Sequence, residues 1–568
     1  MISRTIVLLA LVLAPGGLGT RGAAMDANLS DEIIELPKFI VTDSRVLPPP
    51  EAWRHAEIPG FEILSNASAR ETGRFVRDFE MLQQVVGGIW PAALLATPAV
   101  PTSLVLCARG NSFDAFLTGD LARESRRMNS LFLQDQERAA IVIDFALSEL
   151  ELANGETEES DPYRAFYLQY FRFLIRRMSA QPPPPWLEEG LVQLFASVDF
   201  DKKMVDFAKV GDGFGGGRSG DFNQRLAQRA LVPMEILFAP ERPPRDEAPF
   251  WDSQAYEFVH LCLYGMGKRY QKPFLQFVSR AGREPVTEAM FQECFGMSYR
   301  KMELELRSYA EFTAYQYIHY RAKKGAKGLD EPPAIQLRDA TDAEVGRIKG
   351  EALRLAGNAD AAHHALIAPY IRGSRDPQLL AALGLSELAS GQTERARKFL
   401  EAAARAKAVR AQAYLELARL RYAAAQAQSA DRAGRLSAEQ TAEVLQPLLT
   451  ARIQPPPMRE VYELFLEVWA HSAVVPTREN YDLLLAGAQT FPRQFRLIYR
   501  IAEFGIQYGF TGDAAKLVEY GLQYAPTPEG KALFAGLKTR LPAPLLPTPP
   551  VPGPTVPAPT PAAPSAPR

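Results

Sequence analysis

Two adjacent carboxylates, Glu188 and Glu189, are the residues of this sequence whose type and setting are best suited to chemistry. They lie in an apolar stretch directly after four prolines and a tryptophan. Carboxylates act as general acids or bases, as nucleophiles and as metal ligands. Consecutive residues diverge by about 100° around a helix, so these two do not form the facing pair that a glycosidase needs. Metal chemistry would therefore depend on other ligands.

Histidine and cysteine are sparse in this chain. The six His are scattered, and none occurs between His55 and His260. The three Cys, at positions 107, 262 and 294, form no CxxC and no zinc-ligand spacing, which excludes a disulfide scaffold and a zinc ribbon. No GxSxG motif occurs, and no convincing Ser/His/Asp or Cys/His set is found.

The stretch from Tyr163 to Phe195 resembles the active-site segment of gluzincin, or peptidase-MA-like, metalloproteases. In that family a helix carries the motif HExxH, and a second helix opens with a Glu-Gly pair after a Pro-Trp step. Residues 185–191 (PWLEEGL) match the second half of this segment. The resemblance implies that Glu189 stands where the family has its third zinc ligand.

The residues that align with HExxH lack the two zinc-binding histidines and the catalytic glutamate. Aligned back from Glu189, HExxH falls on residues 168–172 (LQYFR). Leu168 and Arg172 replace the two His, and Gln169 replaces the catalytic Glu. A catalytic zinc needs three protein ligands, and an amide cannot take a proton from water at neutral pH. We therefore expect no metal, no cofactor and no peptidase activity, which makes the chain a pseudoenzyme.

The resemblance continues downstream and implies an α+β domain, a mixed sheet plus helices, over residues 57–321. Trp251–Leu263 resembles the helix that follows the family's Glu helix, and Phe295–Tyr309 resembles its closing segment. An alternative reading is a metal-independent hydrolase that acts on peptide or glycan through Glu188 or Glu189. A third reading treats the domain purely as structural support for the region that follows.

Arg172 invites two readings of its own. Its guanidinium could occupy the vacated zinc position and form a bidentate pair with Glu189, as a structural substitute for the metal. Alternatively, Arg172 could point to solvent together with Arg176 and Arg177. A test between them is the thermal stability of an Arg172→Ala variant.

The aromatic residues of the same segment also have two readings. We expect the aromatics at 167, 170, 171 and 173 to pack in a core. Tyr170, Trp186, Glu188 and Glu189 are nevertheless candidates for a binding groove. A pseudoprotease that binds peptides should keep an open apolar cleft beside Trp186, whereas a structural relic should fill it with aromatics such as Tyr170.

The elements that must position this site have clear local signals. Phe61–Ser65 alternates like a strand, and 102–107 (TSLVLC) and 139–145 (AAIVIDF) are short apolar runs typical of half-buried strands. Ser68 and Glu71 form a capping box, followed by apolar residues at helical spacing at 75, 79, 82 and 86. After residue 161 the pattern becomes helical.

Three further candidates have stronger structural readings. Residues 211–216 (GDGFGG) formally match GxGxxG, but no strand precedes them and no P-loop Lys-Ser/Thr follows, so we expect a mobile loop. His260 lies in an apolar helical segment and is expected to be a core or edge residue. His363 and His364 are expected to be surface or packing residues.

Residues 340–540 are rich in Ala and Leu and contain a repeat. Gly350, Gly357, Ala362 and Leu366 recur 34 residues later as Gly384, Gly391, Ala396 and Leu400. A 34-residue period of helix–turn–helix resembles the tetratricopeptide repeat. We expect the small residues to let two helices approach closely, the second glycine to supply the turn, and the leucine to fill the groove.

The repeat is irregular further along the chain. An insertion at about 426–436 breaks the register, and a later unit fits Ala502, Gly509, Ala514 and Pro526. A generic helical bundle is the alternative. A solenoid of such repeats offers a concave surface for extended peptides, so we expect a protein or peptide partner to bind there.

The first 24 residues predict export. Arg4, an apolar run at 6–14 and small residues at 22–24 are typical of a cleaved signal, which predicts a periplasmic or extracellular protein. No stretch reaches transmembrane length. The balance of 64 Lys+Arg against 66 Asp+Glu argues against nucleic-acid binding.

The sequence thus predicts an α+β domain followed by an all-α tetratricopeptide-like solenoid. The expected segments are a signal peptide (1–24), an extended lead-in (25–56), a degenerate gluzincin-like domain (57–321), a basic linker (322–339), helical repeats (340–540) and a Pro-rich tail (541–568). The predicted function is that of an exported, non-catalytic binding protein.

Overall fold

The protein is described by a computed structural model, which defines residues 37, 49–89, 100–110, 112–119, 129–146, 162–177, 183–208, 230–244, 250–282, 284–311, 317–321, 328–332, 335–429 and 434–541. The expected signal peptide, the Gly-rich loop at 211–216 and the Pro-rich segment after Leu541 lie outside these residues.

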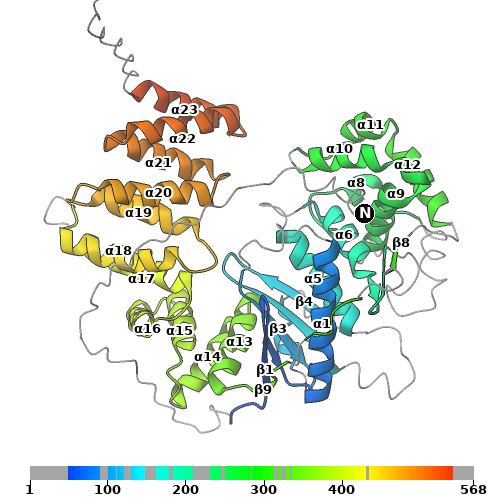
Figure 1. Ribbon diagram of the computed structural model, residues 1–568, viewed down its shortest axis with the longest axis horizontal. Helices are drawn as coiled ribbons and strands as arrows, with labels where there is room; N and C mark the ends of the chain where they lie inside the picture. Colours follow the sequence, from blue (N-terminus) through cyan, green and yellow to red (C-terminus); the bar gives the residue numbers. More distant parts are fainter. Residues whose placement is uncertain are drawn as a thin grey trace, which may run out of the picture. The chain divides into compact units, whose positions relative to one another are not determined.

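A six-stranded mixed sheet forms the centre of the N-terminal region (Figure 1). Its order is β4-β5-β3-β2-β1-β9; β2, β3 and β5 run parallel, whereas β4, β1 and β9 pair antiparallel with their neighbours. The strands are β1 (Arg54–Ile58), β2 (Phe61–Ser65), β3 (Thr102–Cys107), β4 (Ser130–Gln134), β5 (Ala139–Asp144) and β9 (Arg338–Asp339). The three strands expected from the sequence are therefore confirmed as β2, β3 and β5.

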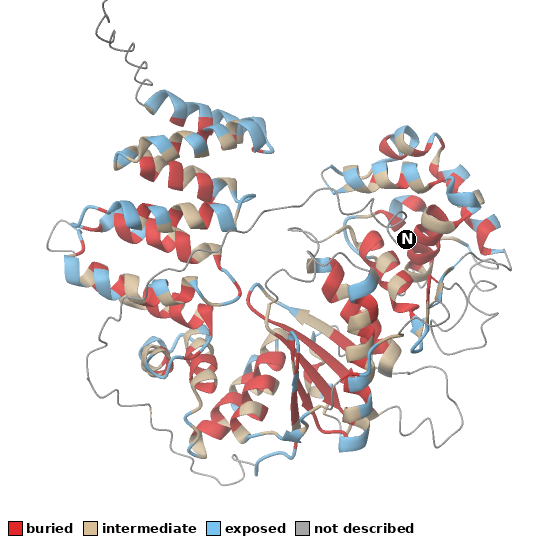
Figure 2. Ribbon diagram, in the orientation of Figure 1, coloured by how far each residue is buried: buried red, intermediate tan, exposed pale blue. Residues whose placement is uncertain are grey.

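Helices cover both faces of this sheet, which is why its central strands are buried throughout (Figure 2). On one face lie α1 (Ala69–Ile89) and α5 (Pro162–Arg177), and on the other lies α13 (Asp342–Leu355). The expected capping box opens α1: the Ser68 amide donates to Glu71 at 3.0 Å, and the Glu71 amide donates to the Ser68 hydroxyl at 3.2 Å.

A second group of elements packs beside α5 around an aromatic core. It comprises α6 (Pro185–Ala196), α8 (Met234–Leu237), α9 (Trp251–Tyr264), η5 (Met266–Lys268), α10 (Gln271–Ala281), α11 (Glu288–Phe295) and α12 (Tyr299–Ala310). A small antiparallel sheet, ordered β6-β7-β8, adds β6 (Asp199–Phe200), β7 (Met204–Phe207) and β8 (Ile318–Arg321). A short helix, η3 (Asp114–Phe116), follows β3.

The C-terminal region is helical. The helices after α13 are α14 (Ala359–Ile371), α15 (Pro377–Ala389), α16 (Thr393–Arg405), α17 (Ala411–Ser429), α18 (Ala438–Arg452), α19 (Arg459–His471), α20 (Arg478–Thr490), α21 (Phe495–Gln507), α22 (Thr511–Tyr524) and α23 (Pro528–Arg540). The expected coarse order, an α+β region followed by helices, is what the structure shows. No helix among the described residues is long and apolar enough to span a membrane.

The 34-residue offset in the sequence corresponds to equivalent places in two helical pairs. A Cβ atom built on Gly350 of α13 would lie 2.7 Å from Leu366 of α14, and one on Gly384 of α15 would lie 2.7 Å from Leu400 of α16. The glycines therefore allow the close helix contacts that were expected.

The other repeat positions also behave alike. Gly357 and Gly391 turn the chain with φ of +82° and +75°, and Ala362 and Ala396 are buried. A left-handed φ favours glycine because a Cβ atom would strain the turn. The later unit keeps part of this pattern, since Ala502 and Ala514 are fully buried.

The compact units differ from the boundaries expected from the sequence. One unit contains the residues up to 417 together with 450–457, and the other contains 418–449 and the residues from 458 onward. The expected linker at 322–339 is no boundary between these units, because β9 within it pairs with β1. Val345, Ile348 and Ala352 of α13 then pack on the sheet. Covering that apolar face holds the first helical pairs to the sheet.

The end of the expected lead-in also belongs to the fold. Trp53 is buried between the sheet and α13, and residues 54–56 form most of β1. The apolar face of a sheet must be covered, and a tryptophan at the edge of the sheet supplies part of that cover.

Candidate functional site

Helices α5 and α6 bring the predicted site residues together. Gln169, Arg172 and Arg176 follow one another at intervals of three and four along α5, so they share one face. Helix α6 begins with Pro185 at its first position, where a missing amide proton costs nothing. The first turn of α6 therefore presents Glu188 and its neighbour to that face of α5.

The contact between Arg172 and Glu189 is confirmed, but its geometry differs from the expected bidentate pair. Arg172 Nη2 donates to Glu189 Oε2 at 2.7 Å, and Arg172 Nε donates to Glu188 Oε1 at 3.2 Å. The guanidinium thus spreads over two carboxylates instead of gripping one. Its third contact, from Nη1 to Gln169 Oε1 at 2.8 Å, comes from the residue at the expected general-base position.

Further side chains complete a balanced network around this guanidinium. Arg176 donates through Nε and Nη2 to Glu188 at 2.9–3.1 Å. Gln193 donates to Glu189 Oε1 at 3.0 Å, and Arg242 binds Asp252 while its Nη1 lies 3.9 Å from Glu189 Oε2. Three guanidinium groups therefore face three carboxylates. The reading in which Arg172 points to solvent is therefore wrong, whereas Arg176 pairs with Glu188 and still remains exposed.

The electrostatics of Glu189 follow from this setting. Burial by itself would raise the pKa of Glu189, because a carboxylate loses its hydration. The charges of Arg172 and Arg242, with hydrogen bonds from Gln193 and Arg172, outweigh burial and lower this pKa below its ordinary value of 4.5. Glu189 is therefore ionised at neutral pH and is committed to its guanidinium partners.

These residues do not fit the zinc ion that the gluzincin resemblance implies. Leu168 has no donor atom and packs against the aromatic core. Gln169 uses its amide nitrogen on Ser130 Oγ at 3.0 Å and its oxygen on Arg172. Glu189 already shares its oxygens between Arg172 and Gln193. A cation placed here would meet a guanidinium and a single carboxylate ligand, so the donor set does not support zinc.

The groove predicted from Tyr170 and Trp186 is not formed by these residues. Trp186 is fully buried, with its ring 5.1–6.2 Å from Phe238, Phe258 and two further phenylalanines of the core. Tyr170 is 3% exposed and stacks on Phe166. The aromatic side chains of several helices fill the space next to the predicted site, as the reading of these residues as core predicted.

Glu188 and Glu189, the other two groove candidates, are each 8% exposed. Both carboxylates are turned to guanidinium groups, so neither presents a free oxygen face to a partner. The four groove candidates therefore act as core and as ion-pair residues.

Sequence reasoning missed several members of this network. Gln193, Arg242 and Asp252 were not singled out, and Arg176 was considered only as a solvent-facing residue. The spacing did carry a signal, because residues 189 and 193 lie one turn apart on α6, as 172 and 176 do on α5. Nothing local in the sequence connects Arg242 to either helix.

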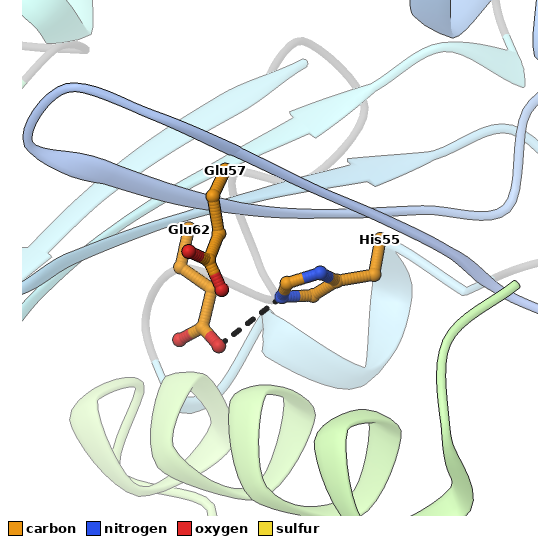
Figure 3. Close-up of side chains that lie close together, drawn as sticks. All are labelled: His55, Glu57 and Glu62. Atoms are coloured by element: carbon orange, nitrogen blue, oxygen red, sulfur yellow. Dashed lines mark hydrogen bonds and ion pairs between the residues drawn. The ribbon is translucent and has the colours of Figure 1, made fainter. Parts of the chain in front are cut away.

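A second polar cluster lies at the β1–β2 hairpin, on His55, Glu57 and Glu62 (Figure 3). Their ligand atoms lie within 4.8 Å of one another, and His55 Nε2 is 3.2 Å from Glu62 Oε1. Arg347 of α13, however, binds both oxygens of Glu62. Burial would raise the pKa of Glu62, but hydrogen bonds from His55 and Arg347 lower it to about 2. The cluster ties α13 to the sheet, and its guanidinium opposes a bound cation.

The remaining histidine predictions concern structural positions. His260 is fully buried, with Nδ1 2.9 Å from the Tyr309 hydroxyl and Nε2 2.9 Å from the Ala208 carbonyl, so it is a core residue as expected. His363 is half-buried, 3.4 Å from Ser386 Oγ, and His364 is exposed. These positions agree with the surface or packing reading.

A buried ion cluster that the sequence did not indicate joins the β4–β5 turn to the first helical pairs. Arg410 is 2% exposed and contacts Glu137 at 2.7 and 3.0 Å and Glu351 at 2.8 and 3.2 Å. Burial would raise the pKa of Glu351, but the charges of Arg410, Arg138 and Arg354 lower it. The three principal residues come from distant parts of the chain, so no local pattern could reveal them.

Comparison with known proteins assigns no family. No family model matches the chain, and no curated protein matches it in sequence. The likeness to gluzincins and to tetratricopeptide repeats therefore rests on the motifs and contacts described above.

Proposed function

We propose that this protein is an exported, non-catalytic relative of metalloproteases whose helical repeats bind a protein or peptide partner. One observation carries the proposal. The guanidinium of Arg172, at the position of the second HExxH histidine, is held by Gln169 and by two carboxylates, including the one at the third-ligand position. A positive side chain there takes the place of a positive metal and leaves no general base.

The alternative of a metal-independent hydrolase has less support. A catalytic carboxylate must be able to reach a substrate or a water, or hold a proton near neutral pH. Glu189 is buried and its pKa is lowered, and Glu188 accepts from both Arg172 and Arg176. Neither residue has the environment of an acid or a nucleophile.

The partner-binding role is assigned to the repeats because the old cleft is filled. Trp186 and Tyr170 are core residues, which by the criterion stated above favours a domain that supports the region after it. Two apolar side chains of the helical region are well exposed: Ile453, directly after α18, and Val475, between α19 and α20, are each 72% exposed. The proposal itself depends on the helical repeats, because stacked repeats offer extended surfaces for peptides, and these two positions serve as probe sites.

Restoring the metal ligands tests the family assignment. A variant with Leu168→His, Gln169→Glu and Arg172→His, together with the native Glu189, would hold the complete gluzincin ligand set. We expect it to bind roughly one equivalent of zinc by mass spectrometry and to gain thermal stability on zinc addition. The native chain should contain less than about a tenth of an equivalent.

The matched control adds Glu189→Ala to the three substitutions. If the gluzincin alignment is right, this fourth change abolishes stoichiometric zinc binding. Zinc binding that survives it, or a folded restored variant that binds none, contradicts the alignment. Circular dichroism with and without zinc distinguishes a variant that fails to fold from one that folds without a site.

Partner binding is tested separately by photo-crosslinking in the exported fraction. A crosslinker replaces Ile453 or Val475 in the helical region, and a control replaces Leu304 of α12, which is 63% exposed. We expect a discrete crosslinked protein from the helical positions and none from position 304. Crosslinks at position 304 alone would move the binding role to the first domain.

A further inference from the structure

Three aromatic residues, Phe495 of α21 with Tyr520 and Tyr524 of α22, form a row on two neighbouring helices that Figure 1 labels. The rings of Phe495 and Tyr520 are stacked with centroids 6.1 Å apart, and those of Tyr520 and Tyr524 lie 4.9 Å apart. Tyr524 is 55% exposed, and the other two rings are half-buried. The row therefore presents ring surface that the described residues only partly cover.

The row borders a shallow hollow of about 470 Å³ on α22. The residues that line it are Ala515, Lys516, Glu519, Tyr520 and Gln523. They lie on the face of α22 opposite to Ala514, Val518 and Gly521, which are buried. The hollow therefore follows the helix for about two turns and ends at the exposed tyrosine.

The charges at this hollow are already paired on the protein. Lys516 Nζ lies 2.9 Å from Asp513, and Glu519 lies 2.8 Å from Lys538 of α23. The Tyr520 hydroxyl donates to the Pro492 carbonyl at 3.0 Å, which fixes its ring. The surface thus offers fixed aromatic faces and no surplus charge, which suits a neutral, apolar ligand.

Neutral ligands that dock on rows of aromatic rings include proline-rich segments. Such segments adopt the polyproline II helix, with three residues per turn and about 9 Å per turn. Their preformed shape reduces the entropy lost on binding, and aromatic-lined grooves recognise prolines spaced three apart. The chemistry of the row therefore points to a polyproline ligand.

The chain carries a segment of this chemistry directly after its last helix. Twelve of the 28 residues from 541 to 568 are proline, and several pairs follow the pattern PxxP, including 544–547, 554–557 and 561–564. Residues 542–568 contain no acid and a single base, Arg568. A segment this neutral matches a hollow whose charges are internally paired.

The segment also starts within reach of the row. Arg540 at the end of α23 pairs with Glu503 of α21 at 2.8 Å, and Leu541 packs against a cluster that includes Val518 of α22. The segment therefore leaves the fold beside the helix that carries the hollow. Residues 542–568 could extend about 80 Å as polyproline II, far more than the length of the row requires.

We propose that the aromatic row of Phe495, Tyr520 and Tyr524 is a binding site for a polyproline segment, and that its ligand is the chain's own segment 542–568. Attachment to the same chain gives an effective concentration on the order of 1 mM, so even a weak site is mostly occupied. Docking covers the exposed apolar rings of the last helical pairs and keeps other Pro-rich ligands from them.

The test uses the full chain and a shortened chain that ends at Leu541, after the last packed helix. The probe is a fluorescein-labelled peptide of residues 542–568, titrated by fluorescence anisotropy. We expect the shortened chain to bind it with a Kd of about 100 µM, and the full chain to bind it about tenfold more weakly because its own segment competes. A peptide with alanine in place of each proline should not bind.

Substitution of the row locates the site. Tyr524→Ala in the shortened chain should weaken peptide binding at least tenfold, whereas Leu533→Ala, at a residue of α23 that is 59% exposed, should leave it unchanged. Equal weakening by both, no binding by the shortened chain, or equal affinity of the full and shortened chains overturns the proposal. A full chain that is dimeric by light scattering, while the shortened chain is monomeric, overturns docking within one chain.

Discussion

Replacing Arg172 by alanine removes the one side chain that contacts Gln169, Glu188 and Glu189 together. The Arg172 side chain is 17% exposed and that of Glu189 is 11% exposed, so the pair is largely shielded from water. The substitution leaves a buried carboxylate with fewer partners. This is the situation in which loss of an ion-pair member is most destabilising.

The magnitude follows from the donors that remain. Breaking a buried ion pair by removing one partner costs about 3–5 kcal/mol. Glu189 keeps its hydrogen bond from Gln193 and the charge of Arg242 at 3.9 Å, so the expected loss lies lower, at about 2–3 kcal/mol. For a domain of this size that loss lowers the unfolding temperature by roughly 3–5 °C.

The loss should depend on pH with a defined sign. In the native chain the pKa of Glu189 is lowered below 4.5, so its ionisation stabilises the fold above that pH, and this contribution falls as the pH drops through the lowered pKa. In the variant, burial is opposed by fewer partners, and the pKa of Glu189 rises. The stability difference between native chain and variant is therefore largest near pH 7 and shrinks toward pH 4.

Calorimetry at pH 7 and pH 4 measures both effects, and hydrogen exchange of α5 and α6 shows whether the loss is local. Arg300→Ala, at an exposed position on α12, is the matched control and should shift the unfolding temperature by less than about 2 °C. A double variant, Arg172→Met with Glu189→Gln, removes both charges and should recover more than half of the loss. An Arg172→Ala variant as stable as the native chain, or a loss equal at both pH values, refutes the reasoning.

Three further changes test the packing of the helical region. Arg410→Met removes the shortest ion pairs of the buried carboxylates of Glu137 and Glu351, which keep Arg138 and Arg354, and should cost about 3 kcal/mol in urea unfolding. A negligible change would mean that water solvates the cluster. Gly384→Val places a side chain against α16 and should cost about 1–3 kcal/mol. Gly391→Ala places a Cβ atom on a residue with a φ of +75° and should cost about 1–2 kcal/mol. Thermal unfolding followed by circular dichroism measures both, and an unchanged melting temperature would show that the helices or the turn adjust at no cost.

The elements with strong local signals could be predicted from the sequence. The strands at 61–65, 102–107 and 139–144 have runs of buried apolar residues, and the capping box at Ser68 marks the start of α1. The 34-residue offset also located the close contact of Gly384 with the facing helix, because only a small residue fits there. Each of these signals arises from residues that are close together in the sequence, so it can be read without knowledge of the fold.

The boundary between the two compact units could not be predicted in this way. The apolar face of α13 carries Val345, Ile348 and Ala352, and its period is the same whether it packs on a helix or on a sheet. Its contact with the sheet depends on which apolar surface lies nearby in three dimensions. The basic linker at 322–339 therefore suggested a boundary that the packing does not follow.

The candidate site was predictable in its pair of residues and not in its geometry. The likeness to the gluzincin segment placed Arg172 and Glu189 at two ligand positions of one site, and their pairing was one of the two readings of Arg172. The divergence of adjacent carboxylates suggested that Glu188 faces elsewhere, but a guanidinium donates in several directions. Arg172 spans both carboxylates through Nε and Nη2, which no spacing in the sequence encodes.

The balanced network also explains why the two helices have one packing arrangement. Aromatic residues surround Tyr170 on one side and Trp186 on the other, and apolar surfaces alone tolerate rotation or sliding. A rotation of α6 by one residue, about 100°, would carry Glu189 away from Arg172 and leave a buried charge that costs about 3–5 kcal/mol. The ion pairs therefore select one orientation of α6 against α5, and the aromatic core packs around it. Under the proposed relationship to metalloproteases, the guanidinium would supply the positioning that a bound metal ion gives two helices, without the chemistry of the metal.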